Sequence, residues 1–215
     1  MIISRTPLRI SFVGGGSDQP AFYKSESGAV TSTAINKYIY IAVNRKFDRK
    51  IRASYSVTEI VDNVDELKHE LIREALKLAG IAGGIEITSI SDVPSRGTGL
   101  GSSSAYTVGL LKALYGFKQM HVGAERLAQE ACQIEIQLCG KPIGRQDQYI
   151  AAYGGLHHIR FNPDDSVFVD PIICRRETRE KLQESLLLLY TGLTRSSDNV
   201  LQEQVQNTTN HDETR

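Results

Sequence analysis

The segment PSRGTGLGSSSA, residues 94–105, constrains the fold of this chain more than any other stretch. The alternating sequence IEITSI at residues 85–90 predicts a β-strand before it, and the composition of residues 103–115 predicts a helix after it. Glycines let the main chain approach an anion closely, and a helix N-terminus presents unpaired N–H groups with partial positive charge. We therefore expect a phosphate-binding turn between a strand and a helix.

This turn contains no lysine, whereas the common phosphate loop, GxxxxGKS/T, has a lysine that reaches the phosphates. Main-chain N–H groups and the helix dipole are therefore expected to hold the anion, with the serines capping the helix. A serine hydroxyl is also a suitable ligand for Mg²⁺. The alternative is a serine-capped turn without a ligand. The candidate nucleotide-binding residues are Pro94, Gly97, Gly99, Leu100, Gly101, Ser102, Ser103 and Ser104.

The order of the predicted elements indicates an α+β domain, because strands dominate the first part of the chain and helices follow later. The patterns predict strands at residues 8–13, 29–43 (one long strand or two short ones), 51–56, 85–90, 156–161, 167–169 and 186–190. They predict helices at residues 65–78, 103–115, 124–138, 148–153 and 177–184. The run LLLLY at residues 186–190 is expected to be a buried strand, and the polar tail after Leu201 predicts a helix without partners or disorder.

Charge and composition restrict the class of function. Lys plus Arg and Asp plus Glu number 25 each, and this balance argues against a nucleic-acid-binding protein. The sequence has neither a signal peptide pattern nor an apolar run of the roughly 20 residues that span a bilayer. Its three cysteines lack paired spacing, which fits a reducing compartment. We expect a cytoplasmic protein with a small-molecule substrate and no membrane partner, and a homodimer is left open.

The turn sequence PSRGTGLGSSSA resembles PxGxGLGSSA, the nucleotide-binding motif of the GHMP kinases, which phosphorylate small alcohols and sugars with ATP. Two other segments resemble motifs of the same family in the same order: RTPLRISFVGGGSDQPAFY at residues 5–23 and GKPIGRQDQYIAAYGG at residues 140–155. The resemblance implies ATP and Mg²⁺ as ligands. It also implies a two-layer N-terminal ATP-binding and catalytic domain at residues 1–180. Residues 181–215 would form only the start of a truncated, ferredoxin-like C-terminal domain, without the family's third glycine-rich motif.

The resemblance also implies roles for residues outside the turn. Asp147 would face the acceptor hydroxyl, as a base or as an electrostatic orienter, and Arg9 would lie beside it. An arginine in an apolar strand is costly unless it is paired or functional, although it could also point outward from an edge strand. Glu135 would bind Mg²⁺ together with Ser103, with Glu130 as a competing candidate on the same predicted helix. For each carboxylate, the alternative is an ordinary surface charge.

The first motif is expected to bind the acceptor sugar, with Asp18 accepting hydrogen bonds from sugar hydroxyls or forming a local turn. Gln19 departs from the family pattern, in which many members have an apolar residue, and we expect it not to touch the chemistry directly. The candidate substrate-binding residues are Gly15, Gly16, Ser17, Asp18, Tyr153 and Arg195.

Within the family, the glycine-rich first motif and the segment YTGLTRS most resemble the D-glycero-D-manno-heptose 7-phosphate kinases. These enzymes form the 1,7-bisphosphate on the way to nucleotide-activated heptose, so the implied substrate is a sugar phosphate. Fucokinase-like and galactokinase-like kinases are the alternative within the family. An alternative from another class is a truncated, non-catalytic module that binds a sugar or a nucleotide.

Overall fold

The computed structural model describes residues 1–94 and 98–189, and the fold is that of these residues. The elements in chain order are β1 (Ile2–Val13), α1 (Pro20–Tyr23), β2 (Gly28–Arg45), β3 (Ile51–Ser54), β4 (Thr58–Val61), a 3₁₀ helix (Val64–Glu66), α2 (Glu70–Leu78), β5 (Ile85–Ser91), α3 (Ser102–Phe117), α4 (Ala124–Cys132), a π-helix (Gln133–Leu138), α5 (Gln146–Tyr153), β6 (Leu156–Phe161), β7 (Val167–Pro171) and α6 (Arg176–Glu184).

The strands form one mixed sheet organised around the long strand β2. In the described residues, its order is β4-β3-β5-β2-β6-β7, and β1 also pairs with β2. One half of β2 pairs with β6, from Gly28 to Thr33, and the other half pairs with β5, from Ile39 to Arg45. Only β3 and β5 run parallel among these pairs. The continuous strand β2 therefore forms hydrogen bonds with strands in both halves of the sheet.

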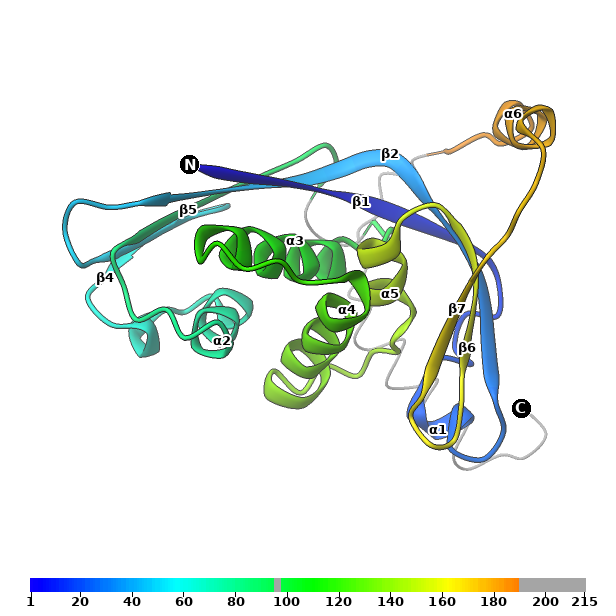
Figure 1. Ribbon diagram of the computed structural model, residues 1–215, viewed down its shortest axis with the longest axis horizontal. Coiled ribbons are helices and arrows are strands. Elements are labelled where there is room, and N and C mark those ends of the chain that lie inside the picture. The colour runs from blue at the N-terminus through cyan, green and yellow to red at the C-terminus, as the bar shows by residue number, and fades with distance from the viewer. Residues whose placement is uncertain (95–97, 190–215) are drawn as a thin grey trace.

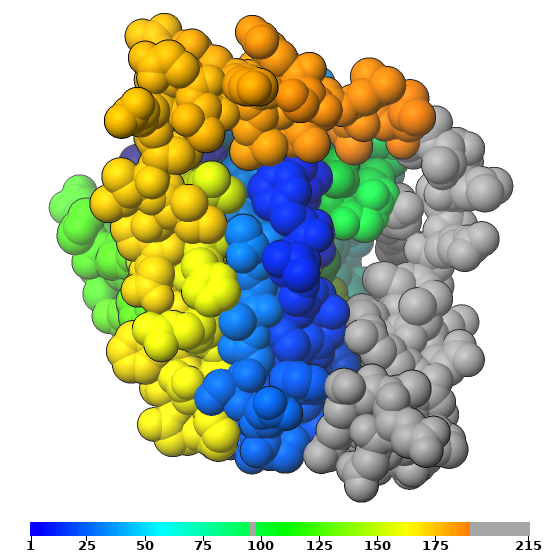
Figure 2. Space-filling model, turned by 90° about the vertical axis from the view of Figure 1, so that its right-hand side faces the viewer, coloured from blue at the N-terminus to red at the C-terminus, as the bar shows by residue number. Residues whose placement is uncertain are grey.

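The helices α2, α3, α4 and α5 cover one face of this sheet, whereas α6 lies apart from them (Figure 1). At one end of the molecule, β7, β6, β2 and β1 run side by side, with α6 across the end of these strands (Figure 2). The arrangement is a two-layer α+β fold, as the element order predicted. None of the helices in the described ranges is long and apolar enough to cross a membrane.

The core consists of two apolar clusters between the helices and the sheet. The larger one joins α2 and α3 to β2, β3 and β5, and includes Ile41, Ile87 and Leu110. The smaller one lies under β6 and includes Tyr149 and Phe161. The helix α3 approaches β1 so closely that a Cβ on Gly109 would lie 2.5 Å from the Thr6 hydroxyl oxygen. This close contact holds the middle of α3 against β1, which carries Arg9.

Several predicted elements differ in detail from the observed ones. The helix predicted at residues 65–78 is a 3₁₀ turn followed by α2, which His69 caps by accepting a hydrogen bond from the N–H of Ile72. The helix predicted at residues 124–138 changes from α4 to the π-helix at Gln133. The short strand β4 was not predicted, because it pairs only with β3 at the sheet edge and none of its residues is fully buried.

The prediction of a buried strand at residues 186–190 is wrong for residues 186–189. These four leucines follow α6, have no regular structure and are exposed, with 82% of the Leu187 surface accessible. Apolar composition alone does not make a strand, because a strand needs a neighbour to pair with, and no described strand lies beside them. Tyr190, the polar tail and most of the predicted C-terminal region lie outside the described residues.

Candidate active site

The glycine-rich turn leads from β5 into α3, as the sequence predicted. Gly99 and Gly101 have left-handed φ angles of +67° and +71°, which side-chain-bearing residues rarely adopt. Gly101 is the N-cap of α3 and no side chain caps the helix, so the expected serine cap is wrong. Ser102, Ser103 and Ser104 are instead the first helical residues, whose main-chain N–H groups have no carbonyl partner within the helix.

The space around this turn suits a ligand. A Cβ on Gly99 would meet no atom of the described residues within 4 Å, so these residues leave the main chain there open to an incoming group. The carbonyl of Leu100 accepts a hydrogen bond from the N–H of Arg9 at 3.1 Å, which ties the turn to β1. Pro94 is exposed before the turn, whereas the predicted residue Gly97 lies outside the described residues.

Arg9 and Asp147 form a two-pronged ion pair beside the turn. The Nε and Nη2 atoms of Arg9 donate to the two carboxylate oxygens of Asp147 at 2.6 and 2.7 Å, and Nη1 donates to the carbonyl of Gly99 at 2.6 Å. A Cβ on Gly101 would lie only 3.1 Å from Asp147 Oδ2, so this carboxylate faces the turn. Asp147 lies in the first turn of α5, which begins two residues before the helix predicted at residues 148–153. Two segments far apart in the sequence therefore meet at the glycine-rich turn.

Glu135 is a fully buried carboxylate on the π-helix, next to the start of α3. Ser103 Oγ donates to its Oε1 at 2.5 Å, and Gln148 Nε2 donates to its Oε2 at 2.7 Å. Burial raises the pKa of Glu135 above its ordinary value, although hydrogen bonds from Ser103 and Ser104 and the charge of Lys141 act in the opposite direction. The competing candidate, Glu130, pairs instead with Arg126 and Tyr115.

The pair of Glu135 and Ser103 fits a hard cation, because Mg²⁺ prefers oxygen ligands and a buried carboxylate lacks a full counter-charge. No group of three or more His, Cys, Asp and Glu side chains converges on a metal position within residues 1–94 and 98–189. A magnesium ion here would therefore take its other ligands from substrate phosphates and water, which is its usual mode of binding at phosphate sites.

Lys141 also contacts the start of α3 behind the glycine-rich turn and was not singled out from the sequence. Its Nζ atom donates to Ser103 Oγ at 2.9 Å and lies 3.8 Å from carboxylate oxygens of both Glu135 and Glu70. The turn has no lysine of its own, but the fold brings one from 38 residues beyond Ser103. The only signal in the sequence was its place in the segment GKPIGRQDQY.

A small hollow of about 90 Å³ lies beside the Arg9–Asp147 pair. Its floor is Asp18, whose carboxylate accepts hydrogen bonds from the N–H of Gly16 at 3.0 Å and from the N–H and side chain of Gln146 at 3.0 and 3.2 Å. Burial raises the pKa of Asp18, against the effect of these main-chain hydrogen bonds. Asp18 therefore holds α5 in place in addition to lining the hollow.

Gln19 also lines this hollow, although the sequence analysis placed it away from the chemistry. Its side chain is 3% exposed, and its amide nitrogen has no hydrogen-bond partner among the described residues. A buried donor without a partner is unfavourable unless a ligand or water supplies an acceptor. Because an amide at this position differs from the apolar family pattern, its role could not be inferred from that pattern.

Other predicted substrate residues lie farther from the hollow. The Ser17 hydroxyl is occupied by the main chain of its own loop, with Oγ 2.7 Å from the carbonyl oxygen of Gly14. Gly15 faces the side chain of Gln146, since its Cβ would lie 3.8 Å from Gln146 Nε2. Tyr153 is at the opposite end of α5 and donates to Glu125 at 2.8 Å. Arg195 lies outside the described residues.

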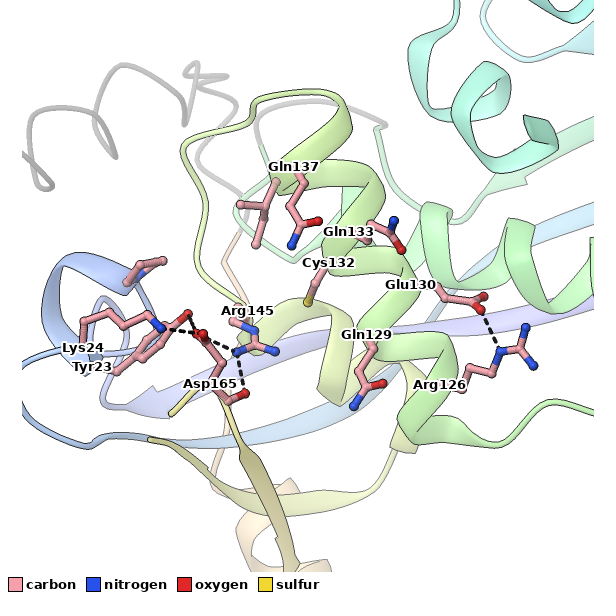
Figure 3. A pocket seen from close by; sticks show the side chains of 12 residues that line it. Tyr23, Lys24, Arg126, Gln129, Glu130, Cys132, Gln133, Gln137, Arg145 and Asp165 are labelled. Carbon is pink, nitrogen blue, oxygen red and sulfur yellow. Dashed lines mark hydrogen bonds and ion pairs between the residues drawn. The ribbon is translucent and has the colours of Figure 1, made fainter. Parts of the chain in front are cut away.

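A larger hollow of about 680 Å³ lies between α1, α4 and the turn after β6. Figure 3 shows Lys24 and Arg145 directed toward Asp165, and Arg126 directed toward Glu130. The closest ion pairs are 2.5 Å from Lys24 to Asp165 and 2.7 Å from Arg126 to Glu130, so both carboxylates are already paired. This hollow lacks the glycine turn, and the smaller hollow beside Asp147 is the better candidate for catalysis.

The chain is similar in sequence and fold to known kinases. The family model described as GHMP kinases N terminal domain matches residues 65–155. The chain is 29% identical over 211 residues to a D-glycero-alpha-D-manno-heptose 7-phosphate kinase of Campylobacter jejuni, covering 93% of this chain and 62% of that relative. It is 26% identical to an L-fucokinase/L-fucose-1-P guanylyltransferase of Bacteroides fragilis, covering 94% of this chain and 25% of the relative.

Among solved structures, a D-glycero-D-manno-heptose 1-phosphate kinase from Bacteroides thetaiotaomicron superimposes with a TM-score of 0.83 at 26% identity. The match covers 97% of this chain and 71% of that one. The chain thus spans about three fifths of the length of the Campylobacter relative and somewhat more of the solved one.

Proposed function

From the GHMP kinase N-terminal fold that this chain carries, we propose that the protein is an ATP-dependent sugar kinase. The observation that supports it most directly is the position of Asp147, which faces the glycine-rich turn at Gly101 while Arg9 holds both of its oxygens. A carboxylate beside a phosphate-binding turn is the arrangement that phosphoryl transfer requires, because the acceptor hydroxyl must lie in line with the phosphate.

In the proposed reaction, the turn at residues 98–104 binds the phosphates of ATP through main-chain N–H groups. The acceptor hydroxyl oxygen attacks the γ-phosphorus, the bond between that phosphorus and the β–γ bridging oxygen breaks, and ADP leaves. The hydroxyl proton passes to Asp147, or Asp147 orients the hydroxyl while solvent takes the proton. Arg9 fixes the carboxylate in the required orientation. Bound magnesium, held by Glu135 and Ser103, would spread the charge of the phosphates.

The proposed acceptor is D-glycero-D-manno-heptose 7-phosphate, phosphorylated on its anomeric hydroxyl to the 1,7-bisphosphate. The support is the similarity to two proteins that are both named as heptose phosphate kinases but differ in the position of the phosphate. The small hollow next to Asp147 would accept the sugar, with the Gln19 amide available to a hydroxyl. Fucose and galactose are the alternative acceptors, since relatives are named for them as well.

A coupled assay of ADP release tests the proposal with heptose 7-phosphate, fucose, galactose and mannose as acceptors. We expect turnover with the heptose phosphate, and a loss of about 10²- to 10⁴-fold in kcat for Asp147→Asn with ATP affinity retained. Asp170→Asn, an exposed aspartate on β7, serves as the matched control and should be unchanged. Equal rates for Asp147→Asn and the unsubstituted chain would refute the assignment. Nucleotide binding without turnover of any sugar would instead support a non-catalytic binding module.

A further inference from the structure

Lys141 is held rigidly at the base of the phosphate-binding turn. Its N–H donates to the carbonyl of Glu135 at 3.0 Å, and its own carbonyl accepts from the N–H of Ile143 at 2.9 Å. Gly140 precedes it with a φ of +65°, which turns the chain sharply after the π-helix. The main chain of Lys141 is therefore fixed, and only its flexible side chain can change position.

The ammonium group of Lys141 is not locked in a close ion pair. Its nearest partner is the neutral Ser103 hydroxyl at 2.9 Å, whereas the nearest carboxylate oxygens of Glu135 and Glu70 are both 3.8 Å away. A lysine carries three donors, and one of them is used by Ser103. The side chain is 20% exposed, so the charge is partly withdrawn from water and still accessible from the turn.

The alternative is a purely structural role, in which Lys141 only neutralises the charge of the buried Glu135. That explanation predicts a short contact between the two charges, because a pair withdrawn from water is favourable only with good geometry. The observed contact goes to Ser103, the residue whose N–H also lies at the open end of α3. The ammonium group therefore lies on the side of Glu135 that faces the phosphate-binding turn.

We propose that Lys141 is the phosphate-binding cation of this site, which supplies from another segment the lysine that the glycine-rich turn lacks. The inference rests on the proposed nucleotide function and assigns the residue that binds the phosphate chain. On nucleotide binding, Nζ exchanges its contact with Ser103 for phosphate oxygens, and the Ser103 hydroxyl becomes available to a metal ion. Lys141 acts with the main-chain N–H groups at residues 102–104 and adds the charge that they cannot supply.

Equilibrium binding of nucleotides without turnover tests this assignment. A fluorescent ATP analogue is titrated into the 215-residue chain in EDTA, and ATP and AMP are then used to displace it. Lys141→Met should weaken ATP binding about 10- to 100-fold, as expected for the loss of one hydrogen bond between charged groups, and should leave AMP binding within about threefold. Lys141→Arg should retain most of the ATP affinity, and Lys141→Gln replaces the Met variant if the latter does not fold.

Lys50→Met is the matched control, because it removes one exposed lysine charge, 49% accessible, from another part of the fold. It should change ATP affinity by less than about twofold. Two results overturn the assignment of Lys141 while leaving the nucleotide function intact: unchanged ATP affinity in Lys141→Met, or equal weakening of ATP and AMP, which indicates a purely structural lysine. If the unsubstituted chain binds no nucleotide, the proposed function itself fails and the assignment fails with it.

Discussion

Replacing Gly144 by alanine should disrupt the loop that positions Asp147, because the added methyl group would collide with the side chain of Asp18. A Cβ on Gly144 would lie 1.9 Å from Asp18 Oδ2 and 2.3 Å from its Cγ, far inside van der Waals contact. The φ of Gly144 is outside the left-handed region, so alanine would not strain the backbone. The whole penalty therefore comes from the collision with the carboxylate of Asp18.

The magnitude follows from what Asp18 holds. Its carboxylate is buried and accepts hydrogen bonds from the main-chain N–H groups of Gly16 and Gln146, both at 3.0 Å. Moving the carboxylate away leaves two partly buried donors without acceptors, at about 1–3 kcal/mol each. We therefore expect Gly144→Ala to lower the free energy of unfolding by about 2–6 kcal/mol. Since Gln146 precedes Asp147, the ion pair with Arg9 should loosen as well.

Urea unfolding monitored by circular dichroism measures this loss, and Gly15→Ala is the control. Gly15 lies in the loop that carries Asp18, but its Cβ would approach only Gln146 Nε2, at 3.8 Å, so the variant should stay within about 0.5–1 kcal/mol of the unsubstituted chain. The decisive comparison repeats Gly144→Ala in an Asp18→Ala background, where no carboxylate remains to collide with. The coupling energy should be at least about 2 kcal/mol. The same cost in both backgrounds would refute the steric argument.

Two further predictions concern buried ionisable groups. Because burial raises the pKa of Glu135, its stabilising contribution is fully present below its ordinary pKa of about 4.3 and is lost as pH rises through the higher folded value. The free energy of unfolding is measured by urea titration in EDTA for the unsubstituted chain and for Glu135→Gln. The value for the unsubstituted chain minus the value for Glu135→Gln should fall as pH increases above about 4. A difference that stays constant with pH would contradict this prediction. Burial also raises the pKa of the Cys132 thiol to about 12, so thiol-specific labelling at pH 8 should modify Cys174 first and reach Cys132 only on unfolding, as mass spectrometry of the labelled peptides would report.

Local patterns in the sequence were sufficient to predict the elements that carry the site. The alternation before the glycine-rich turn and the apolar composition after it correspond to β5 and α3, because both elements bury faces of matching periodicity. The resemblance to family motifs also predicted which segments meet, and Arg9 and Asp147 are in contact across 138 positions. Their catalytic roles remain predictions, since contact alone does not establish chemistry.

Other features could not be predicted because they depend on partners distant in the sequence. The π-helix at Gln133–Leu138 follows α4 without a break, and its wider turn is recognisable only in three dimensions. The leucines at residues 186–189 have the composition of a buried strand but no described strand pairs with them. Lys141 reaches Ser103 only because the π-helix and the turn at Gly140 direct it there.

The charges that meet at the turn explain why the site needs cations from several segments. Among the residues that the structure describes, three carboxylates lie around it, on Asp18, Glu135 and Asp147, and the cations beside them are Arg9 and Lys141. A triphosphate would enter a region that already carries negative charge, and main-chain N–H groups contribute only partial charges at a helix terminus. The charge of Arg9 is already compensated by Asp147 at 2.6 and 2.7 Å, whereas Lys141 lies 3.8 Å from the carboxylate oxygens of Glu135 and Glu70, so Lys141 is the cation with charge available for phosphate. In this arrangement, the glycine-rich turn provides shape and N–H donors, and a neighbouring segment provides the charge.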